Sequence, residues 1–498
     1  MSNTTPRPVE RTGEAITNTY DEVLYVGHPH AQTHPDRLAP LARLHGVEAA
    51  PVDTCRVLEI GCGDGANIVP MAATLPSAEF TGIDYAARPV ARAQKMVEEL
   101  GIANVRIAQL DLRDFPADAG SFDYIIAHGL YSWLPLEVRQ HLMPLIARHL
   151  APNGIAYVSY NVFPGCRVRQ AAWDVLKFHT RDCHDLKSKL AAARALIPLM
   201  IDSDGPVSRG EDTLRAEFRK LAGRPDALLG HDDLSDQNNP VYFHEFVADA
   251  ARSGLTFVAE TDMFTMTAGD FMPHVRDALE QMDRLTREQY LDFFRFRPFR
   301  CSLICHANAL PDFELRPDRI LGMHALPSQT VRVMTANGKV VRYQNDDAPG
   351  LMNILMERWP DCVPVAELAA WHSALKPRAG VAFDASLSFE TLMVELCIAG
   401  AVEVRTRPQA VATVAGERPV AFGPARWVCR DSEIVPNLYH DGIHLGDAIL
   451  RQLLQLLDGT RRRAELVTML GDACSGPEGT EHLDAALAGL AQRALLVA

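Results

Sequence analysis

The chain has 498 residues, more than one ordinary core holds, so about two to four structural units are expected on the rule of ~150 residues each. Its 49 Lys and Arg against 63 Asp and Glu give a formal net charge of -14, which argues against nucleic acid as the main partner because phosphate binding needs a basic face. No apolar run approaches the ~18 residues of a membrane span, so no membrane partner is expected.

The N-terminal stretch, residues 1–18, is polar and lacks the apolar centre of a secretion signal or an anchor, so we expect a loose tail. Ten cysteines are scattered without a C-x-x-C pair, which is typical of reduced thiols in a cytoplasmic protein. Cys301, Cys305 and His306 lie close together, but the alternation around them favours strand neighbours over metal ligands. We therefore predict a cytoplasmic protein without a metal site.

Residues 27–35 contain three histidines and two prolines, a pattern that invites a zinc hypothesis. However, the prolines hold the segment extended, and no nearby Cys or carboxylate pattern completes a tetrahedral ligand set. We instead predict that residues 1–40 form a tail followed by a cap that closes over a ligand. The side chains expected to face inward are Tyr20, Tyr25, Gln32 and His34.

Residues 56–68 read Arg-Val-Leu-Glu-Ile-Gly-Cys-Gly-Asp-Gly-Ala-Asn-Ile. The short apolar run before the glycines predicts a buried parallel strand, then a tight turn and a helix whose first amide N–H groups are free. The pattern E-x-G-x-G-x-G differs from the G-x-G-x-x-G of dinucleotide sites. Glu59 would repel a pyrophosphate and suits the ammonium of an amino acid, which favours S-adenosylmethionine over NAD.

Two further strands each end in an acid. Residues 80–84 end in Asp84, about 20 residues beyond the glycines, where a ribose diol would be held. Residues 105–111 end in Asp111, placed to meet an adenine amino group. Each acid alone is equally consistent with a helix cap or a surface residue, but all three in register after a glycine turn favour a cofactor site.

These three elements resemble those of the class I S-adenosylmethionine-dependent methyltransferases, in the same places and order. Such a resemblance implies a Rossmann-like sheet with S-adenosylmethionine as cofactor. The residues that it implies for cofactor binding are Tyr25, Gln32, Glu59, Gly61, Cys62, Gly63, Asn67, Asp84, Asp111, Leu112 and His128.

Helices are predicted over 70–75 and 87–100, a loop over 112–120, a buried strand over 122–128, a helix over 135–150 and a fifth strand over 155–161. Ligands of open α/β sheets bind outside the carboxyl ends of the strands, so the residues that follow the last two strands should face substrate. The candidates for catalytic roles are His128, Tyr131, Trp133 and Asn161.

A complete sheet of this class has seven strands, of which the last two form an antiparallel pair. Residues 167–229 have helical periodicity, so we predict a helical insertion over the substrate side, and the missing strands at 254–260 and 300–306. Further helices are predicted over 241–253, 270–282 and 286–294. We therefore divide this part into two segments. Residues 41–166 form a methyltransferase core, and residues 167–308 form a helical insertion and regulatory region that also contains the last two strands of the sheet.

Residues 293–300 alternate aromatic and basic side chains, which could stack on and neutralise nucleic acid. Because the chain is strongly acidic, we favour another interpretation, in which this stretch is the end of a helix that leads into an internal strand, with the arginines on its solvent-exposed side.

The character of the chain changes after residue 310. Residues 315–343 alternate, with turns at Pro327 and at Asn337-Gly338, the latter a hairpin signal. Helices are expected at 351–359, 365–375 and 389–399, and the alternating residues 401–405 complete an α+β, winged-helix-like domain over 309–425. The acidic charge disfavours a DNA role for it and favours docking or dimerisation, hence a homodimer. Residues 426–498 are predicted to form a helical C-terminal domain, without a motif connected to chemistry.

Four stretches are similar to bacterial class I methyltransferases that carry a methyltransferase regulatory domain. They are residues 25–35 with Gln32-Thr33-His34-Pro35, 127–133, 159–165 and 239–246. Some members, the rickettsial enzymes acting on outer-membrane proteins, are protein lysine methyltransferases. The resemblance covers most of the chain to about residue 308 and, more weakly, the C-terminal part. It does not fix the methyl acceptor.

Methyl transfer from a sulfonium is an in-line displacement, so the enzyme mainly aligns the donor and an uncharged nucleophile in a dry pocket. A lysine amine must first lose its proton, and aromatic walls lower an amine's pKa and favour the positive methyl. The candidate walls are Tyr25, Tyr131, Trp133 and Phe163. Tyr160, Asn161 or His128 would orient the lone pair, with His128 or His34 as the bases near neutrality. For each of them singly, core packing is equally consistent with the sequence.

Three functions stay open at this point. The leading hypothesis is an S-adenosylmethionine-dependent methyltransferase acting on protein lysine. A small-molecule acceptor is the alternative within the same class, because the insertion would close a pocket as easily as flank a groove. The third is a catalytically inactive regulatory or scaffold protein that binds the cofactor.

Overall fold

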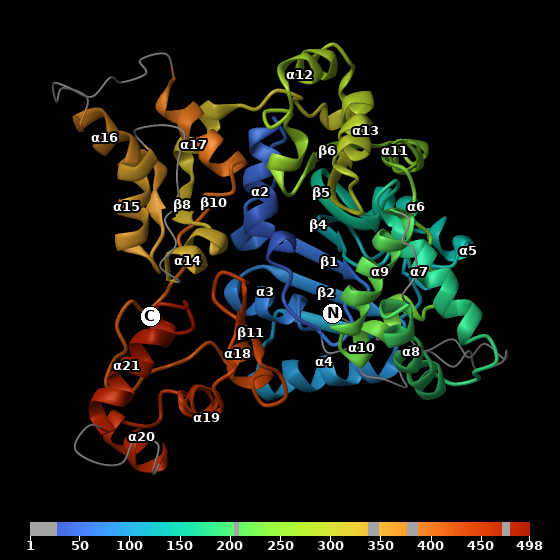
Figure 1. Cartoon of the computed structure of the whole chain (residues 1–498). Coiled ribbons are helices and arrows are strands. Elements are labelled where there is room, and N and C mark those ends of the chain that lie inside the picture. Colours follow the sequence, from blue (N-terminus) through green and yellow to red (C-terminus); the bar gives the residue numbers. More distant parts are fainter. Residues whose placement is uncertain (1–26, 204–208, 337–347, 376–386, 471–478) are drawn as a thin grey trace.

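The computed structural model describes residues 27–203, 209–336, 348–375, 387–470 and 479–498 (Figure 1). At its centre is a seven-stranded sheet of order β3-β2-β1-β4-β5-β7-β6. The strands β1 to β5 run parallel, and β7 is antiparallel to both β5 and β6. The predicted seven-stranded sheet with an antiparallel last pair is confirmed. Its strands are β1 Arg56–Ile60, β2 Glu79–Asp84, β3 Val105–Gln109, β4 Phe122–Ala127, β5 Leu150–Asn161, β6 Leu255–Glu260 and β7 Phe299–His306.

Alternate residues of the central strands enter two separate cores, one on each face of the sheet. Val57 of β1 and Tyr124 of β4 belong to one, and Leu58 and Ile125 to the other. The first core includes α2 (Pro35–Leu44), α3 (Ile68–Thr74) and α4 (Ala87–Leu100), and the second includes α6 (Leu142–His149) and α11 (Phe243–Arg252). The glycine turn between β1 and α3 is therefore supported from both faces.

The helix predicted over 135–150 is instead two helices, α5 (Leu136–Arg139) and α6. Proline has no N–H and is best tolerated in the first turn of a helix. Pro144 is the third residue of α6, so its place fixes where a new helix begins.

The insertion after β5 consists of α7 (Cys166–His179), α8 (Leu186–Ile201), α9 (Arg209–Ala222) and α10 (Asp226–Leu228), as its periodicity predicted. These helices have an apolar core of their own, which includes Leu176, Leu190 and Phe218. In Figure 1 they lie on the side of the sheet opposite to the C-terminal helices α15 to α21. A parallel bridge between Val162 and Val241 joins the two ends of the insertion.

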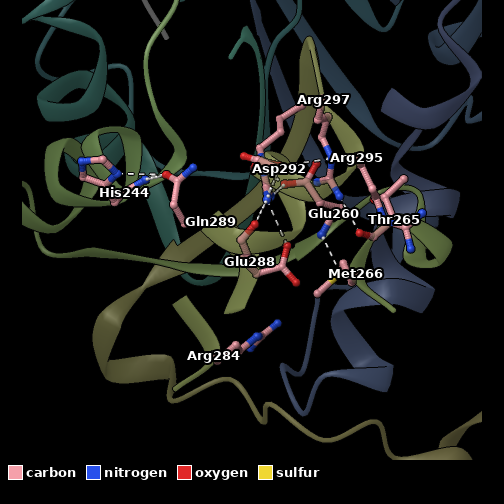
Figure 2. A network of polar contacts seen from close by, with 12 residues as sticks. His244, Glu260, Thr265, Met266, Arg284, Glu288, Gln289, Asp292, Arg295 and Arg297 are labelled. Atoms are coloured by element: carbon pink, nitrogen blue, oxygen red, sulfur yellow. Dashed lines mark hydrogen bonds and ion pairs between the residues drawn. The ribbon is translucent and has the colours of Figure 1, made fainter. Parts of the chain in front are cut away.

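A buried network of charges ties the regulatory region to the sheet (Figure 2). Arg300 of β7 is fully buried and pairs with Glu260 of β6 at 2.8 Å, and with Asp292 and Glu288 of α13 (Arg284–Arg295) at 2.9 and 3.1 Å. Buried charges are costly unless they are paired in this way. The short helix α12 (Pro273–Glu280) completes the region.

The part of the chain after β7 contains a three-stranded sheet of order β10-β8-β9, formed by Val402–Arg405, His324–Pro327 and Val363–Pro364. The prediction of alternating strands over 315–343 holds only for His324–Pro327, because Pro317–Gly322 is a 3-10 helix and residues 337–343 lie outside the described residues. Gln329–Ala336 is a helix, α14, because the Ser328 hydroxyl accepts from the Val331 N–H at 3.2 Å and caps it. The hairpin expected at Asn337-Gly338 lies outside the described residues. The other helices here are α15 Ala348–Arg358, α16 Val365–Leu375 and α17 Phe389–Ile398, close to their predicted places.

The C-terminal unit packs on the first core of the sheet rather than standing apart. Trp427 of α18 (Gly423–Val428) donates to Glu99 of α4 at 3.0 Å, and the guanidinium of Arg92 lies 4.6 Å from its ring centre. A hairpin of β11 (Ile434–Pro436) and β12 (Gly442–His444), which the sequence did not predict, follows α18. The remaining helices are α19 Ala448–Leu456, α20 Arg463–Leu470 and α21 Gly479–Ala491.

Among the described residues, no helix combines the length and the apolar character needed to cross a membrane. Over the same ranges, no three His, Cys, Asp or Glu side chains gather as metal ligands would.

Candidate functional site

The turn after β1 leaves open backbone for a ligand. Gly61, Gly63 and Gly65 all have positive φ, at 79°, 51° and 77°, a region that side chains disfavour. A methyl group added at Gly63 would meet nothing within 4 Å among the described residues, whereas one at Gly65 would lie 2.9 Å from Ala93 of α4. Gly65 is therefore needed for the close packing of the turn against α4, while Gly63 faces open space in which a ligand can bind.

Glu59, at the carboxyl end of β1, is the acid of the glycine motif. It is 3 % exposed, and Asn67 donates to its Oε1 at 2.7 Å. Its Oε2 is buried and has no hydrogen-bond partner in the part of the chain that the structure describes. Burial raises the pKa of Glu59 to about 8. An unpaired buried carboxylate oxygen fits a cation such as the ammonium of an amino acid.

Asp84 and Asp111 follow the next two strands as predicted, but they differ in what they contact. Asp84 accepts from the Gly63 N–H at 2.9 Å and from the Ala86 N–H at 2.8 Å, so it shapes the glycine turn. The carboxylate of Asp111 pairs with Arg113 at 2.6 Å and caps the short turn that starts at Leu112. Their contacts with a ribose and an adenine stay predictions.

The described part of the cap, from residue 27, lies against the ends of the strands. The rings of His30 and His128 are 3.7 Å apart, and His128 Nδ1 lies 2.8 Å from the Tyr157 hydroxyl. The side chain of Gln32 is hydrogen-bonded to the same hydroxyl, so Gln32 does face inward. The predicted inward-facing Tyr20 and Tyr25 lie outside the described residues.

The interpretation of His128 and His34 as bases near neutrality is corrected. Burial lowers the pKa of His128 to about 3, and that of His34 well below its ordinary value. His34 accepts from the Asp36 N–H at 3.1 Å and lies 3.2 Å from the Thr74 hydroxyl, which are structural contacts at the start of α2. Both rings are neutral at physiological pH.

The residues predicted at the acceptor side separate into two groups. Asn161 is 4 % exposed and donates to Asn238 at 3.1 Å, and Phe163 lies 5.3 Å from the ring of Tyr242. Asn161 is also paired across the sheet with Phe299, whose ring lies 6.3 Å from that of His128. These residues surround the carboxyl ends of β4 and β5.

Tyr131 and Trp133 point instead toward the helices around them. The Tyr131 hydroxyl donates to Asp249 of α11 at 2.7 Å, and its ring packs on Phe246. Trp133 is half-buried beneath Arg169 of α7, 5.8 Å away. The structure therefore does not bring these two together with His128 and Asn161. Aromatic residues after a strand look alike in sequence whether they line a pocket or fill a core.

Sequence reasoning missed residues that reach the site from far along the chain. Tyr242 lies in the stretch 239–246 that the family resemblance had singled out, and Phe299 lies in the alternating stretch 293–300. His440, in the C-terminal unit, has its Nε2 2.9 Å from Asn67 Oδ1. No pattern near His440 could have identified it, because its partner is 373 residues away.

Three family descriptions match the chain. "Methyltransferase domain" matches residues 57–154, "Predicted methyltransferase regulatory domain" residues 225–306, and "PKMT, C-terminal winged helix domain" residues 417–484. The last match falls mostly on the segment predicted as a helical domain, 426–498, and overlaps the predicted winged-helix segment 309–425 only at residues 417–425.

The curated relatives include the uncharacterized proteins RP789 and RP028 of Rickettsia prowazekii. The former is 36% identical over 291 residues, 58% of this chain and 53% of RP789, so the chain spans about half the length of that relative. RP028 is 31% identical over 235 residues, 47% of this chain and 94% of RP028. Among solved structures, PKMT2 from Rickettsia typhi in complex with AdoHcy matches with a TM-score of 0.82 at 22% identity, over 95% of this chain and 100% of that one.

The mixed seven-stranded sheet and the carboxylate-led glycine turn define a class I methyltransferase. The open backbone at Gly63 and the unpaired oxygen of Glu59 fit S-adenosylmethionine, the cofactor of that class. Within it, the chain belongs to the S-adenosylmethionine-dependent methyltransferases that carry a methyltransferase regulatory domain, and it shares the fold of the rickettsial PKMT2.

Proposed function

We propose that this protein methylates lysine side chains of protein substrates with S-adenosylmethionine as methyl donor. The observation that carries the proposal is a continuous aromatic surface that leads outward from the carboxyl end of β5. Ring contacts run from Phe163 to Tyr242 at 5.3 Å, to Phe293 at 6.0 Å and to Tyr290 at 5.8 Å. Phe293 and Tyr290 are 41% and 40% exposed. Exposed clusters of large apolar side chains mark interaction surfaces, and a small acceptor needs no such surface.

The fold of PKMT2 and the match to the PKMT winged-helix description support the same acceptor class. Trans-aconitate 2-methyltransferase of Azoarcus sp. matches over 103 residues only, 21% of this chain. That likeness is too short to favour a small-molecule acceptor.

The residues around the strand ends suit a neutral amine nucleophile. S-adenosylmethionine, when bound, supplies a methyl carbon to the amine lone pair, and the electrons of the broken C–S bond stay on sulfur. Glu59 Oε2 would accept from the ammonium of the cofactor and hold it in register. With an acceptor bound, the neutral ring of His128 and the aromatic rings of Phe163 and Phe299 would exclude water from the lysine amine and so lower its pKa.

Asn161 is the side chain assigned to orient the acceptor. Its Nδ2 donates to Asn238, so its Oδ1 would accept one N–H of the amine and turn the lone pair toward the methyl group. The proton that the lysine ammonium must lose leaves to water before transfer, because no neighbouring histidine is basic enough to take it.

The test is incubation of the protein with methyl-labelled S-adenosylmethionine and a bacterial lysate, followed by separation of proteins from small molecules and hydrolysis of labelled bands. Label recovered as methyl-lysine would support the proposal. Label found only in the small-molecule fraction, or in another amino acid, would overturn it. Binding of S-adenosylmethionine without label in either fraction would identify an inactive cofactor-binding protein.

A further inference from the structure

We propose that His440 is a positioning residue for the cofactor, so that the loop between β11 and β12 of the C-terminal unit completes the site around Glu59. The inference rests on the cofactor site of the proposed function and adds a residue from the opposite end of the chain. It also assigns a role to a unit in which the sequence contains no motif connected to chemistry.

The hydrogen bonds around Asn67 fix which way its amide points. The Oδ1 accepts from the backbone N–H of His30 at 2.8 Å, and a backbone N–H can only donate. The Nδ2 therefore faces Glu59, to which it donates at 2.7 Å. Because Oδ1 is an acceptor, the Nε2 of His440, 2.9 Å away, must carry a hydrogen and donate to it.

His440 is held at this place against two local costs. Its φ is +66°, in the left-handed region that residues other than glycine rarely adopt. Its side chain is fully buried, and its Nδ1 has no hydrogen-bond partner within the described ranges. Residues kept in strained and unsatisfied conformations cluster at functional sites, where the surroundings over-determine them. Stability alone gives no reason to place a histidine here.

The loop that carries His440 is fixed on both sides. Asp441 is fully buried and pairs with Arg37 of α2 at 2.9 Å and with Arg332 of α14 at 2.7 Å. Asn437 accepts from the backbone N–H groups of Tyr439 and Asp441 at 2.9 and 2.8 Å. The position of the imidazole is therefore set by the docking of the C-terminal unit on α2 and not by the loop alone.

The Asn67 side-chain amide, at the start of α3, thus joins this helix to two distant segments: the cap, through His30, and the C-terminal unit, through His440. Glu59 takes its orientation from the same amide. A ligand that binds Glu59 should therefore stabilise the docking of the β11–β12 loop against Asn67. The docked loop should raise the affinity for the ligand by the same free energy, because coupling between two binding events is reciprocal.

Calorimetry with S-adenosylmethionine tests the proposal. His440→Ala removes the donor to Asn67, and we expect its Kd to rise about tenfold, the effect of losing one buried hydrogen bond. His440→Gln places an amide N–H near the former Nε2 and should restore most of the affinity. His149→Gln is the matched control. His149 is also buried, but it bonds to the Gly120 carbonyl at 2.8 Å, away from the glycine turn, so its Kd should not change.

Hydrogen exchange gives a second test, whose first measurement uses only the wild-type chain. Saturating S-adenosylmethionine should slow exchange of the backbone amides of residues 437–441, and His440→Ala should lose that protection. Wild-type Kd values in His440→Ala, or unchanged exchange of the loop in the wild type, would overturn the inference. If the wild type itself does not bind S-adenosylmethionine, the proposed function fails instead.

Discussion

Asn67 Nδ2 donates to Glu59 Oε1 at 2.7 Å, while the other oxygen of the same carboxylate is buried without a partner among the described residues. Glu59 is therefore oriented but electrostatically unsatisfied. Such a group stabilises a cation that reaches it far more than an exposed carboxylate would, because the charge interacts in a less polar surrounding. Two predictions rest on this arrangement.

Cofactor binding should release protons near neutral pH. Burial raises the pKa of Glu59 to about 8, so the carboxyl is mostly protonated at pH 7 before binding. The ammonium of S-adenosylmethionine favours the ionised form and lowers that pKa, so about one proton leaves per molecule bound. Calorimetry at pH 7 in buffers of different ionisation enthalpy measures it. A heat of binding that is independent of the buffer would contradict the prediction, and Glu59→Gln should release none.

Glu59→Gln should also make the free protein more stable at high pH. The pKa of Glu59 rises on folding from 4.5 to about 8, so between these values the folded state binds more protons than the unfolded state. The free energy of unfolding of the wild type therefore falls as pH rises through this window. Thermal melting at pH 5 and pH 8.5 should show a higher melting temperature for Glu59→Gln than for the wild type mainly at the higher pH.

The affinity of Glu59→Gln for S-adenosylmethionine should fall about 30-fold or more, as for a lost buried charge pair.

The aromatic surface should act on the protein acceptor and not on the cofactor. Phe293→Ser removes a 41%-exposed ring from that surface, and we expect KM for a protein acceptor to rise about tenfold, as for an interface anchor. The Kd for S-adenosylmethionine should stay unchanged. Phe178→Ser is the matched control, because Phe178 is 70% exposed but lies at the end of α7. Equal effects of the two substitutions would argue against a specific docking surface.

The pH dependence of methyl transfer should not report His128. Its pKa is lowered to about 3, so the ring is neutral throughout the range in which the enzyme is assayed. We expect kcat/KM to rise with pH as the acceptor amine loses its proton, with the same profile in His128→Gln at a lower rate. A limb near pH 6.5 that is present in the wild type and absent from His128→Gln would assign a proton transfer to this residue.

Arg300 should be a major determinant of stability. Arg300→Met leaves Glu260, Glu288 and Asp292 buried near one another without their shared cation, at a cost of about 3–5 kcal/mol. The comparison is Arg316→Met, which removes an exposed ion pair with Asp312 and should cost about 1 kcal/mol or less. Thermal melting of both variants measures the difference. Similar melting temperatures for the two would show that the network is not a principal support of the regulatory region.

The fold of the described residues up to 308 could largely be predicted because its signals are local. Each strand of the sheet is a short apolar run beside a turn, and the insertion has a helical period over its whole length. The error at Pro317–Gly322 and Gln329–Ala336 has the same origin, since alternation alone does not distinguish a strand from a short helix, and only His324–Pro327 finds a distant strand, Val402–Arg405, to pair with. The hairpin of β11 and β12 has only three residues in each strand, too few for a period to be visible.

The residues of the candidate site also divide into those that the local sequence identifies and those that only the tertiary structure brings together. Glu59, the glycines and Asp84 could be found together from the sequence, whereas His440 contacts Asn67 of the glycine turn only through tertiary packing. Tyr131 and Trp133 follow a strand end as predicted, but the helices of the insertion and of the regulatory region take up their side chains. The homodimer, the cytoplasmic location and the domain boundaries stay predictions.

The bridge between Val162 and Val241 closes the helical excursion at its base before any of its helices begins. A closed excursion can lengthen at an entropic cost of only about 0.6 kcal/mol per doubling. We therefore expect that the helices α7 to α10 can be shortened or exchanged between related enzymes while Phe163, Asn238 and the strands that carry the donor stay in place. If these helices contact the acceptor, a chimera that exchanges α7 to α10 should change which acceptor is methylated without changing the affinity for S-adenosylmethionine.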